Sequence, residues 1–501
     1  MSITGPGSIT AANLTAQTNM FNQLDKLSEQ LGTGEAAQTY SGLSSQAGLA
    51  LGLSAQLSAI NGYSSTATAV NTTLTLAQSV LTQISKAGST VQQSMIQQVP
   101  FALDSNGQTA TQTSAASYLD QILSLLNTQV GDNYIFSGSA VNQPSVASTS
   151  EILNGNGAQI GLTQVISQRQ QADQGVGGLG RLTITAPSAS TVSISQDSSP
   201  FGFKLAGVNS SLTGATVTGP SGTPPSISVD LASNPNAGDS IQFSLTLPDG
   251  STQTITLEAT TASPPGANQF TIGATPSDTA SNLQAALSSA VGDLAQTALP
   301  AASAVAAANN FFTSDPPQLV AGPPYDTATS LVNGTPSDVV FWYTGENGST
   351  PALQTATAQV GPSVTTAYGM RANEQAISSL VANVAALAAT TFSASDPNAQ
   401  ASYQALSQRV QANLDGQPGT QTVSDIEANL ADAQVTVSNA TTMNTQTQTT
   451  LQNMLQGIEG VNQNQIGEDI LTLQNQLSAS MSVTARLAQM SLVNYLGPVT
   501  G

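Results

Sequence analysis

The chain has 501 residues, of which 39% are hydrophobic and only 7% are charged, whereas about a quarter of an ordinary globular chain is charged. Twenty-eight acidic and eight basic residues give a net charge of −20. The basic residues are scattered singly along the sequence, which argues against a phosphate-binding patch and so against nucleic-acid binding. Cysteine and histidine are absent, which excludes disulfides and thiol catalysis and removes the commonest general base and metal ligand.

The chain begins with MSITGPGSIT, which lacks the basic and apolar segments of a Sec-type signal peptide. We expect residues 1–12 to be unstructured and an amphipathic helix to follow over 13–31. Its apolar residues recur at steps of four, three and four, which places them on one helix face, and Gly32 and Gly34 then close the segment. This first stripe consists of Met20, Leu24, Leu27 and Leu31.

A second long helix is predicted over 49–99, after a Gly- and Ser-rich break at 32–48. Its apolar residues keep steps of four, three, four, three and seven, a regularity that favours a coiled-coil-like seam. A shorter helix is expected over 115–130, then a short strand at 134–136, and loop and strand over 161–181. The seam residues of the long helix are Val70, Leu74, Ala77, Leu81, Ile84 and Val91.

The composition changes at Leu182, where a long segment rich in Pro, Gly, Ser and Thr begins. Runs such as TVSIS, SISVDL and IQFSLTL alternate apolar and polar residues, as half-buried strands do. LPDGS at 247–251 predicts a hairpin turn between two such runs, and FTI at 270–272 predicts a further strand. A helix is expected over 279–298. Later, VVFWY at 339–343 carries the single Trp and predicts a core strand.

The pattern then returns to helix, and helices are predicted over 367–392, 399–415 and 421–455. Three glycines between 457 and 467 each weaken a helix by about 1 kcal/mol and indicate a joint there. The chain ends in an amphipathic helix over 466–496, whose apolar residues recur at steps of four, three, four and four. This terminal stripe consists of Ile466, Ile470, Leu473, Leu477 and Met481, and Leu487 continues it.

The similar helices at the two ends predict an assembly seam, because a long amphipathic helix needs a partner for its apolar face. The predicted fold is mainly α with a β-rich insertion. Paired N- and C-terminal segments would form a long antiparallel coiled-coil-like bundle, and the middle of the chain an outward α+β module. The predicted segments are 1–48, an inner helical segment paired with 458–501; 49–182, a helical rod with a short β-element, paired with 337–457; 183–336, the outer β-rich insertion; 337–457, the returning rod; and 458–501, the C-terminal inner helix.

No pattern in the sequence points to an active site. GVGGLG at 175–180 matches a dinucleotide-binding glycine motif, but a Gln-rich stretch precedes it where a strand is required, so it is interpreted as a linker. The acidic pair Glu468 and Asp469 lies on the polar side of the terminal helix and is interpreted as a solvated face. No candidate nucleophile has a base beside it in the sequence. We therefore expect no enzyme activity, no cofactor and no metal.

Three stretches carry a resemblance to a known family. DNYIFSG at 132–138 resembles the [YF]-[LI]-F-[SG]-G element of bacterial flagellins, and YGMRANE at 368–374 resembles a stretch of their alphaproteobacterial members. The ending, 473–496, is similar to their terminal helix. The chain therefore resembles the bacterial flagellin family, which includes filament flagellins and the flagellar hook–filament junction protein. Residues 200–315 resemble an insertion module of some alphaproteobacterial members.

The resemblance, which covers roughly 1–180 and 337–501, implies terminal helices that line a filament channel, a second helical layer between subunits, and a middle that projects outward. It implies export in an unfolded state through the flagellar secretion apparatus and a secreted, extracellular location in the flagellum. The implied partners are further copies of the chain in a homopolymer, hook-associated proteins, a cap protein and an export chaperone, with no nucleic acid and no membrane. Only Lys86 stands where many flagellins carry a basic R-x-R-like element.

The leading hypothesis is a structural subunit that self-assembles into the flagellar filament for motility. The alternative within the family is the junction protein between hook and filament, which the ending resembles equally. The size of the insertion favours the filament, where outward decoration covers a long surface. A third hypothesis, of a different class, is a secreted adhesin whose β-rich module binds a ligand.

Overall fold

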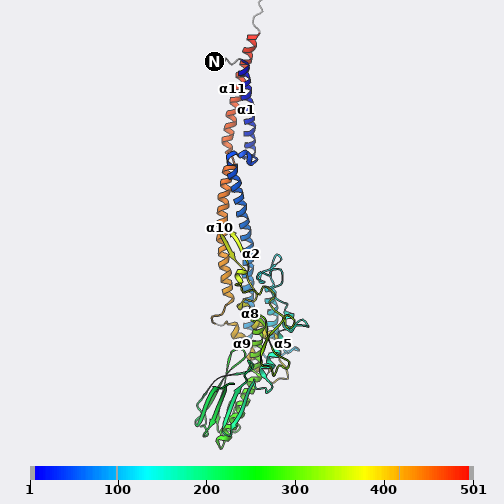
Figure 1. Cartoon of the computed structure of the whole chain (residues 1–501), viewed down its shortest axis with the longest axis vertical. Coiled ribbons are helices and arrows are strands. Elements are labelled where there is room, and N and C mark those ends of the chain that lie inside the picture. The colour runs from blue at the N-terminus through cyan, green and yellow to red at the C-terminus, as the bar shows by residue number, and fades with distance from the viewer. Residues whose placement is uncertain (1–5, 97–99, 417, 496–501) are drawn as a thin grey trace, which may run out of the picture. The chain divides into compact units, whose positions relative to one another are not determined.

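The structure is a computed structural model in which residues 6–96, 100–416 and 418–495 are described, with side chains from 11 to 489 within those ranges. The chain is mainly helical, with long N- and C-terminal helices and a central β-rich region (Figure 1). It divides into two compact units. Unit 1 comprises Met1–Asn71, Ala358–Thr366 and Val435–Gly501, and unit 2 comprises Thr72–Thr357 and Ala367–Gln434.

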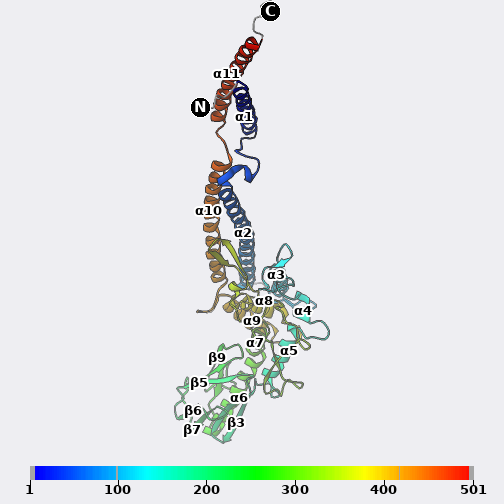
Figure 2. The same cartoon turned by 45° about the horizontal axis from the view of Figure 1, so that its top comes forward.

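The first helix of unit 1, α1 (Pro6–Thr33), begins earlier than the sequence analysis predicts. Residues 6–12 are helical rather than unstructured, and residues 1–5 lie outside the described part of the chain. Proline suits the first turn of a helix because its missing N–H is not needed there, so the helix can begin at Pro6. The terminal helix α11 (Gln463–Tyr495) lies beside α1 (Figures 1 and 2).

A second helix pair in unit 1 comes from α2 (Ala47–Ile96) and α10 (Val423–Glu459), each of which continues into unit 2. Leu53 and Ile60 of α2 share one buried cluster with Leu451 of α10. The N-terminal part of α2 and the C-terminal part of α10 therefore stabilise each other through one core. All six residues of the stripe predicted on α2 are buried, whether they lie in unit 1 or unit 2.

A small hairpin, β13 (Thr357–Gly361) and β14 (Val364–Ala367), packs on α10 in unit 1. The side chain of Asn444 on α10 is 2% exposed, and its Nδ2 donates to the carbonyl oxygen of Val360 at 2.8 Å. A buried amide needs such a partner. This hydrogen bond therefore fixes the position of the hairpin along the helix.

The predicted joint before the terminal helix is confirmed, since α10 and α11 are separated by residues 460–462. Gly460 forms an isolated β-bridge with Glu35, which follows α1. The N–H of Val461 donates to the carbonyl oxygen of Gly34 at 3.1 Å. The break after α1 and the break before α11 therefore lie against each other, bound by backbone hydrogen bonds.

The helical part of unit 2 includes α7 (Ala298–Phe312), a helix that the sequence analysis misses. Its Ala-rich sequence is buried on nearly every side, so it has no polar face and no amphipathic period to detect. It packs against helices α5, α8 and α9. The other helices of this part are α3 (Ala110–Leu126), α4 (Thr149–Asn154), α5 (Leu162–Gln174), α8 (Gln375–Ala389) and α9 (Ala399–Leu414).

The prediction of loop and strand over 161–181 is wrong, because α5 occupies most of that segment. The buried residues of α5 include Gln168, Arg169 and Asp173 beside its apolar residues. Polar residues on the inward side weaken the hydrophobic period, which is the main sequence signal for a helix. The hydrophobic pattern of the sequence therefore does not predict this helix.

The stretch 339–343 is buried as predicted, but it is not a strand. It forms only two isolated β-bridges, at its first and last residues. Trp342 is 4% exposed, and its indole N–H donates to the carbonyl oxygen of Phe312 at 2.9 Å. The strand predicted at 134–136 is instead a two-residue strand that starts one residue earlier. The short elements are β1 (Gln129–Val130) paired with β2 (Asn133–Tyr134), β11 (Gln318–Val320) paired with β12 (Leu331–Asn333), and the 3₁₀ helices η1 (Tyr40–Gln46) and η2 (Ala352–Thr355).

The β-rich part of unit 2 contains two four-stranded sheets and helix α6 (Pro276–Gln296). Figure 2 shows α6 among these strands. The sheet orders are β3-β4-β7-β6 and β10-β9-β8-β5. The predicted hairpin at 247–251 is confirmed, because it joins the antiparallel pair β8 and β9. Strand alternation buries one face of each sheet against α6 and the other sheet. The strands are β3 (Leu182–Ser188), β4 (Thr191–Gln196), β5 (Lys204–Ser210), β6 (Ala215–Ser221), β7 (Ser226–Leu231), β8 (Ser240–Thr246), β9 (Thr252–Thr260) and β10 (Gln269–Thr271).

Helix α10 begins with a reciprocal cap that predicts a pH effect. The backbone N–H and the hydroxyl of Thr422 both donate to the Asp425 carboxylate at 2.8 Å, which lowers the pKa of Asp425 below its ordinary value of 3.8. Because the folded pKa is lowered, the stabilisation is complete above pH 3.8 and is lost as the pH falls through the folded pKa. We expect amide exchange at the start of α10 to accelerate in that acid window, and Asp425→Asn to remove the pH dependence. If amide exchange at the start of α10 in the wild-type protein does not change across this pH range, the stabilising role assigned to the Asp425 carboxylate is contradicted.

Candidate assembly surface

The two terminal helices of unit 1 run antiparallel. Nε2 of Gln17, in the middle of α1, donates to Oγ1 of Thr484 at 3.0 Å. At the end of α1, a Cβ on Gly34 would lie 3.6 Å from Nε2 of Gln463, the first residue of α11. Residue numbers therefore rise along α1 as they fall along α11.

The structure places the ten predicted seam residues at three levels of burial. Ile466, Leu473 and Leu477 are each 7% exposed. Leu31 and Met481 are 38% and 44% exposed, so neither is covered within one copy. The seam is therefore only partly closed by the chain itself. The half-buried members are Met20, Leu24, Leu27, Ile470 and Leu487.

Unit 1 leaves many more apolar side chains in solvent than unit 2. Of the fifteen large hydrophobic side chains that are exposed in the described part of the chain, twelve belong to unit 1, which is the smaller unit. Large apolar side chains gathered in solvent in one part of a chain are candidates for an interaction surface. The twelve are Leu14, Phe21, Leu31, Tyr40, Leu49, Leu51, Val435, Met443, Met454, Leu471, Met481 and Val483.

Two helices that contribute to unit 1, α2 and α10, carry very little charge. Helix α2 has one charged residue, Lys86, in 50 residues. Helix α10 has none from Val435 to Ile458. In an assembly of identical acidic subunits, surface charge would place like charges against each other, and that repulsion is avoided here. Uncharged helix faces with exposed apolar residues can therefore pack closely against further copies.

The two internal stretches that carry the family resemblance, 132–138 and 368–374, meet in unit 2. Ser137 and Arg371 form an antiparallel bridge. Beside it, the N–H of Gly138 donates to the carbonyl oxygen of Met370 at 2.9 Å. Segments far apart in sequence thus form one joint.

Arg371 is the charged centre of this joint. Its side chain is 9% exposed and lies 3.9 Å from the carboxylate of Glu346. Its Nη1 donates to the carbonyl oxygen of Gly348 at 2.7 Å, and its Nη2 donates to that of Thr350. The guanidinium therefore organises the loop around 346–350.

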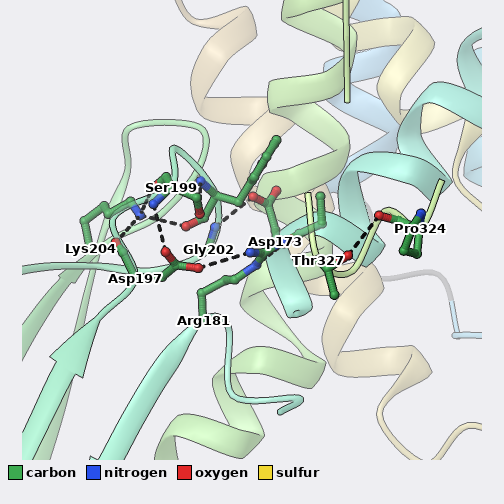
Figure 3. Close-up of polar contacts among 10 residues, drawn as sticks. Asp173, Arg181, Asp197, Ser199, Gly202, Lys204, Pro324 and Thr327 are labelled. Carbon is green, nitrogen blue, oxygen red and sulfur yellow. Dashed lines mark hydrogen bonds and ion pairs between the residues drawn. The ribbon is translucent and has the colours of Figure 1, made fainter. Parts of the chain in front are cut away.

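A second charged group, the cationic cluster, lies where α5 meets the β-rich part of unit 2 (Figure 3). It consists of Arg169, Arg181 and Lys204 with Asp173 and Asp197. Nε of Arg169 lies 2.8 Å from Asp173, and Nη1 of Arg181 lies 3.1 Å from Asp197. Three of the eight basic residues, scattered in the sequence, are thus gathered at one place.

Backbone groups and one aromatic ring complete the cationic cluster. The guanidinium carbons of Arg169 and Arg181 lie 5.3 and 5.5 Å from the ring centre of Phe201, within cation–π range. Nζ of Lys204 donates to the carbonyl oxygen of Phe201 at 2.8 Å. Burial raises the pKa of Asp173, although the Arg169 guanidinium opposes the rise. Burying these charges costs desolvation free energy, which the ion pairs, hydrogen bonds and cation–π contacts of the cluster offset. The cluster therefore acts as an anchor between α5 and the β-rich part.

A buried ion pair also joins the helices to the β-rich part of unit 2. Nε of Arg409 on α9 lies 2.9 Å from Oδ2 of Asp249 in the β8–β9 turn, and the two side chains are 9% and 5% exposed. A polar cleft of about 700 Å³ opens beside this pair, lined mainly by Ser, Asn, Gln and Thr side chains. The β-rich part is thus held to the helices at two separate points.

The described residues include no group of three or more His, Cys, Asp or Glu side chains placed to hold a metal ion. None of the described helices has the length and hydropathy that a membrane span requires. No protein-family model matches the chain, and no curated protein matches it. A function can therefore be proposed only from the sequence resemblance, the fold and the exposed helix faces. The terminal helices of this chain pair with each other and leave apolar surface uncovered.

Proposed function

We propose that this protein is a structural subunit that self-assembles into the bacterial flagellar filament. Its terminal helices would pack as a coiled-coil-like bundle with those of neighbouring copies, and the β-rich part would decorate the assembly. It would be exported unfolded and polymerise outside the cell. The proposal rests on the resemblance at 132–138, 368–374 and 473–496 together with the uncovered helix faces.

The observation that carries the proposal is the concentration of exposed apolar side chains on unit 1. Leu14 and Phe21 stand two turns apart on α1 and are 64% and 46% exposed. On α11, Leu471 and Val483 are 62% and 53% exposed. These residues flank the α1–α11 contact, so a pair of helices alone cannot cover them. Contact with several copies would bury them. Each Å² of apolar area removed from water in this way would stabilise the assembly by roughly 25 cal/mol.

Electron microscopy of negatively stained, concentrated protein tests the proposal. We expect full-length protein to form long filaments and a deletion of 466–501 to remain dispersed, because the deletion removes the apolar face opposite α1. Circular dichroism of the deletion variant checks that unit 2 still folds. Short rings or stubs from full-length protein would favour the hook–filament junction protein instead. Full-length protein that stays dispersed at every concentration would contradict both roles.

A further inference from the structure

The β-rich part of unit 2 ends in an unusual edge strand. β10 is the terminal strand of its sheet and pairs with β9 in parallel, with Gln269 opposite Glu258 and Thr271 opposite Thr260. Only residues 261–268 connect the two strands, fewer than the dozen or more that a parallel connection usually needs. The connection folds back on itself, since Oγ1 of Thr271 donates to the carbonyl oxygen of Ala262 at 2.8 Å.

The outer edge of β10 presents backbone groups. Alternate residues of a parallel strand point their N–H and C=O groups to opposite sides. The N–H of Ile272 donates to Thr260 on β9, so Gln269 and Thr271 point away from β9. Gln269 N–H is used within its own turn, and the Thr271 carbonyl oxygen accepts from Nδ2 of Asn282 at 2.8 Å. The Thr271 N–H and the Gln269 carbonyl remain at the open edge, spaced to bond an added strand.

A groove lies along this edge. It has a volume of about 360 Å³, and its walls are the 265–271 segment and helix α6. Leu257 and Phe270 contribute apolar atoms to it, and α6 contributes small side chains such as Ala285 and Ser289. A small-residue helix face opposite an open strand edge leaves room for the side chains of an extended chain. Edge strand, groove and helix are the three parts of a β-augmentation site.

The charge around the groove selects the kind of occupant. Asp293 lines it and is exposed. Its carboxylate favours a segment that carries Lys or Arg. The exposed basic residues of this chain, in the part where side chains are described, are Lys26, Lys86 and Arg486, and all three lie within long helices. Another copy of the chain therefore offers no suitable extended basic segment.

We propose that the groove between β10 and α6 binds an extended segment of another protein, which adds a strand to β10 and carries small apolar side chains beside a basic residue. Backbone hydrogen bonds to Gln269 and Thr271 fix the strand, and the groove accepts alternate side chains. The carboxylate of Asp293 pairs with the basic residue. This binding role belongs to the β-rich part and is independent of assembly through the terminal helices.

Selection of peptides on the intact protein tests this inference. A phage-displayed random heptapeptide library is selected on full-length, unassembled protein after depletion on the Ala285→Trp variant, whose indole fills the groove. We expect enrichment of sequences that alternate small apolar residues and contain Lys or Arg. A synthetic peptide of the enriched sequence is then measured by fluorescence polarisation. Replacing its basic residue by Glu should weaken binding at least tenfold.

Matched variants separate groove binding from misfolding. Thr271→Pro removes the outward N–H and should abolish peptide binding, whereas Thr271→Ser keeps both that N–H and the hydroxyl that donates to Ala262, and should bind as wild type does. Ser281→Trp, on the exposed part of α6 outside the groove, controls for Ala285→Trp. Thermal unfolding confirms that each variant folds. No enrichment over the depleted library, or equal binding by Thr271→Pro and Thr271→Ser, would overturn the inference.

Discussion

Replacing Leu473 by Asp is expected to abolish filament formation. Leu473 is 7% exposed on the face of α11 that meets α1. Truncating a buried Leu costs about 2–5 kcal/mol, and an unpaired carboxylate in the same place adds a desolvation cost. No basic side chain of α1 is available to pair with it except Lys26. The two terminal helices should therefore separate, and amide exchange should rise along α1 and α11 while unit 2 keeps its protection.

Two variants on the same helix give this prediction its controls. Gln474→Asp adds the same charge on the exposed side and should leave helix pairing intact. Leu471→Asp, at a side chain that is 62% exposed, should also keep α1 and α11 paired. It should nevertheless weaken filament formation, because the proposed contact with other copies buries it. Filaments of normal length from Leu473→Asp protein, seen by electron microscopy, would rule out the proposed role of the seam.

The second large effect is expected at the buried pair Arg409 and Asp249. Arg409→Met leaves the Asp249 carboxylate buried without its partner, and such a loss costs about 3–5 kcal/mol. The double variant Arg409→Met, Asp249→Asn removes both charges and should recover most of that stability. Urea denaturation monitored by the circular dichroism of the β-rich part measures wild type, Arg409→Met, Asp249→Asn and the double variant, which together form a thermodynamic cycle.

Asp293→Asn is the matched control, because it removes an exposed charge from α6 and should change stability by less than about 0.5 kcal/mol. An Arg409→Met variant as stable as wild type would show that the pair does not anchor the β-rich part. A double variant no better than the single one would show that the two charges act independently.

The long helices and most strands could be predicted because their patterns are local. Steps of three and four residues indicate α1, α2 and α11, and alternation indicates β4, β7 and β8. Helices α5 and α7 were missed for opposite reasons. Helix α5 buries polar residues that interrupt its period, whereas α7 is apolar on nearly every side and has no period.

The terminal helices could be predicted, but the cationic cluster could not. Arg169, Arg181 and Lys204 are separated in sequence by a linker and two strands, and only folding brings them together. One local signal existed, since Arg169 and Asp173 are four residues apart, the spacing of an ion pair along a helix. It was unused because that segment was not expected to be helical. Which side chains of unit 1 stay exposed also depends on tertiary packing, which a stripe alone does not determine.

The burial of the arginines affects how readily proteases can cleave the folded protein. The side chains of Arg169, Arg181, Arg371 and Arg409 are each less than a tenth exposed. Proteases that cut after basic residues need such a side chain in an accessible, extended stretch. These four arginines are therefore poor cleavage sites for trypsin-like enzymes in the folded protein, an advantage for any chain that has to survive where such enzymes are released.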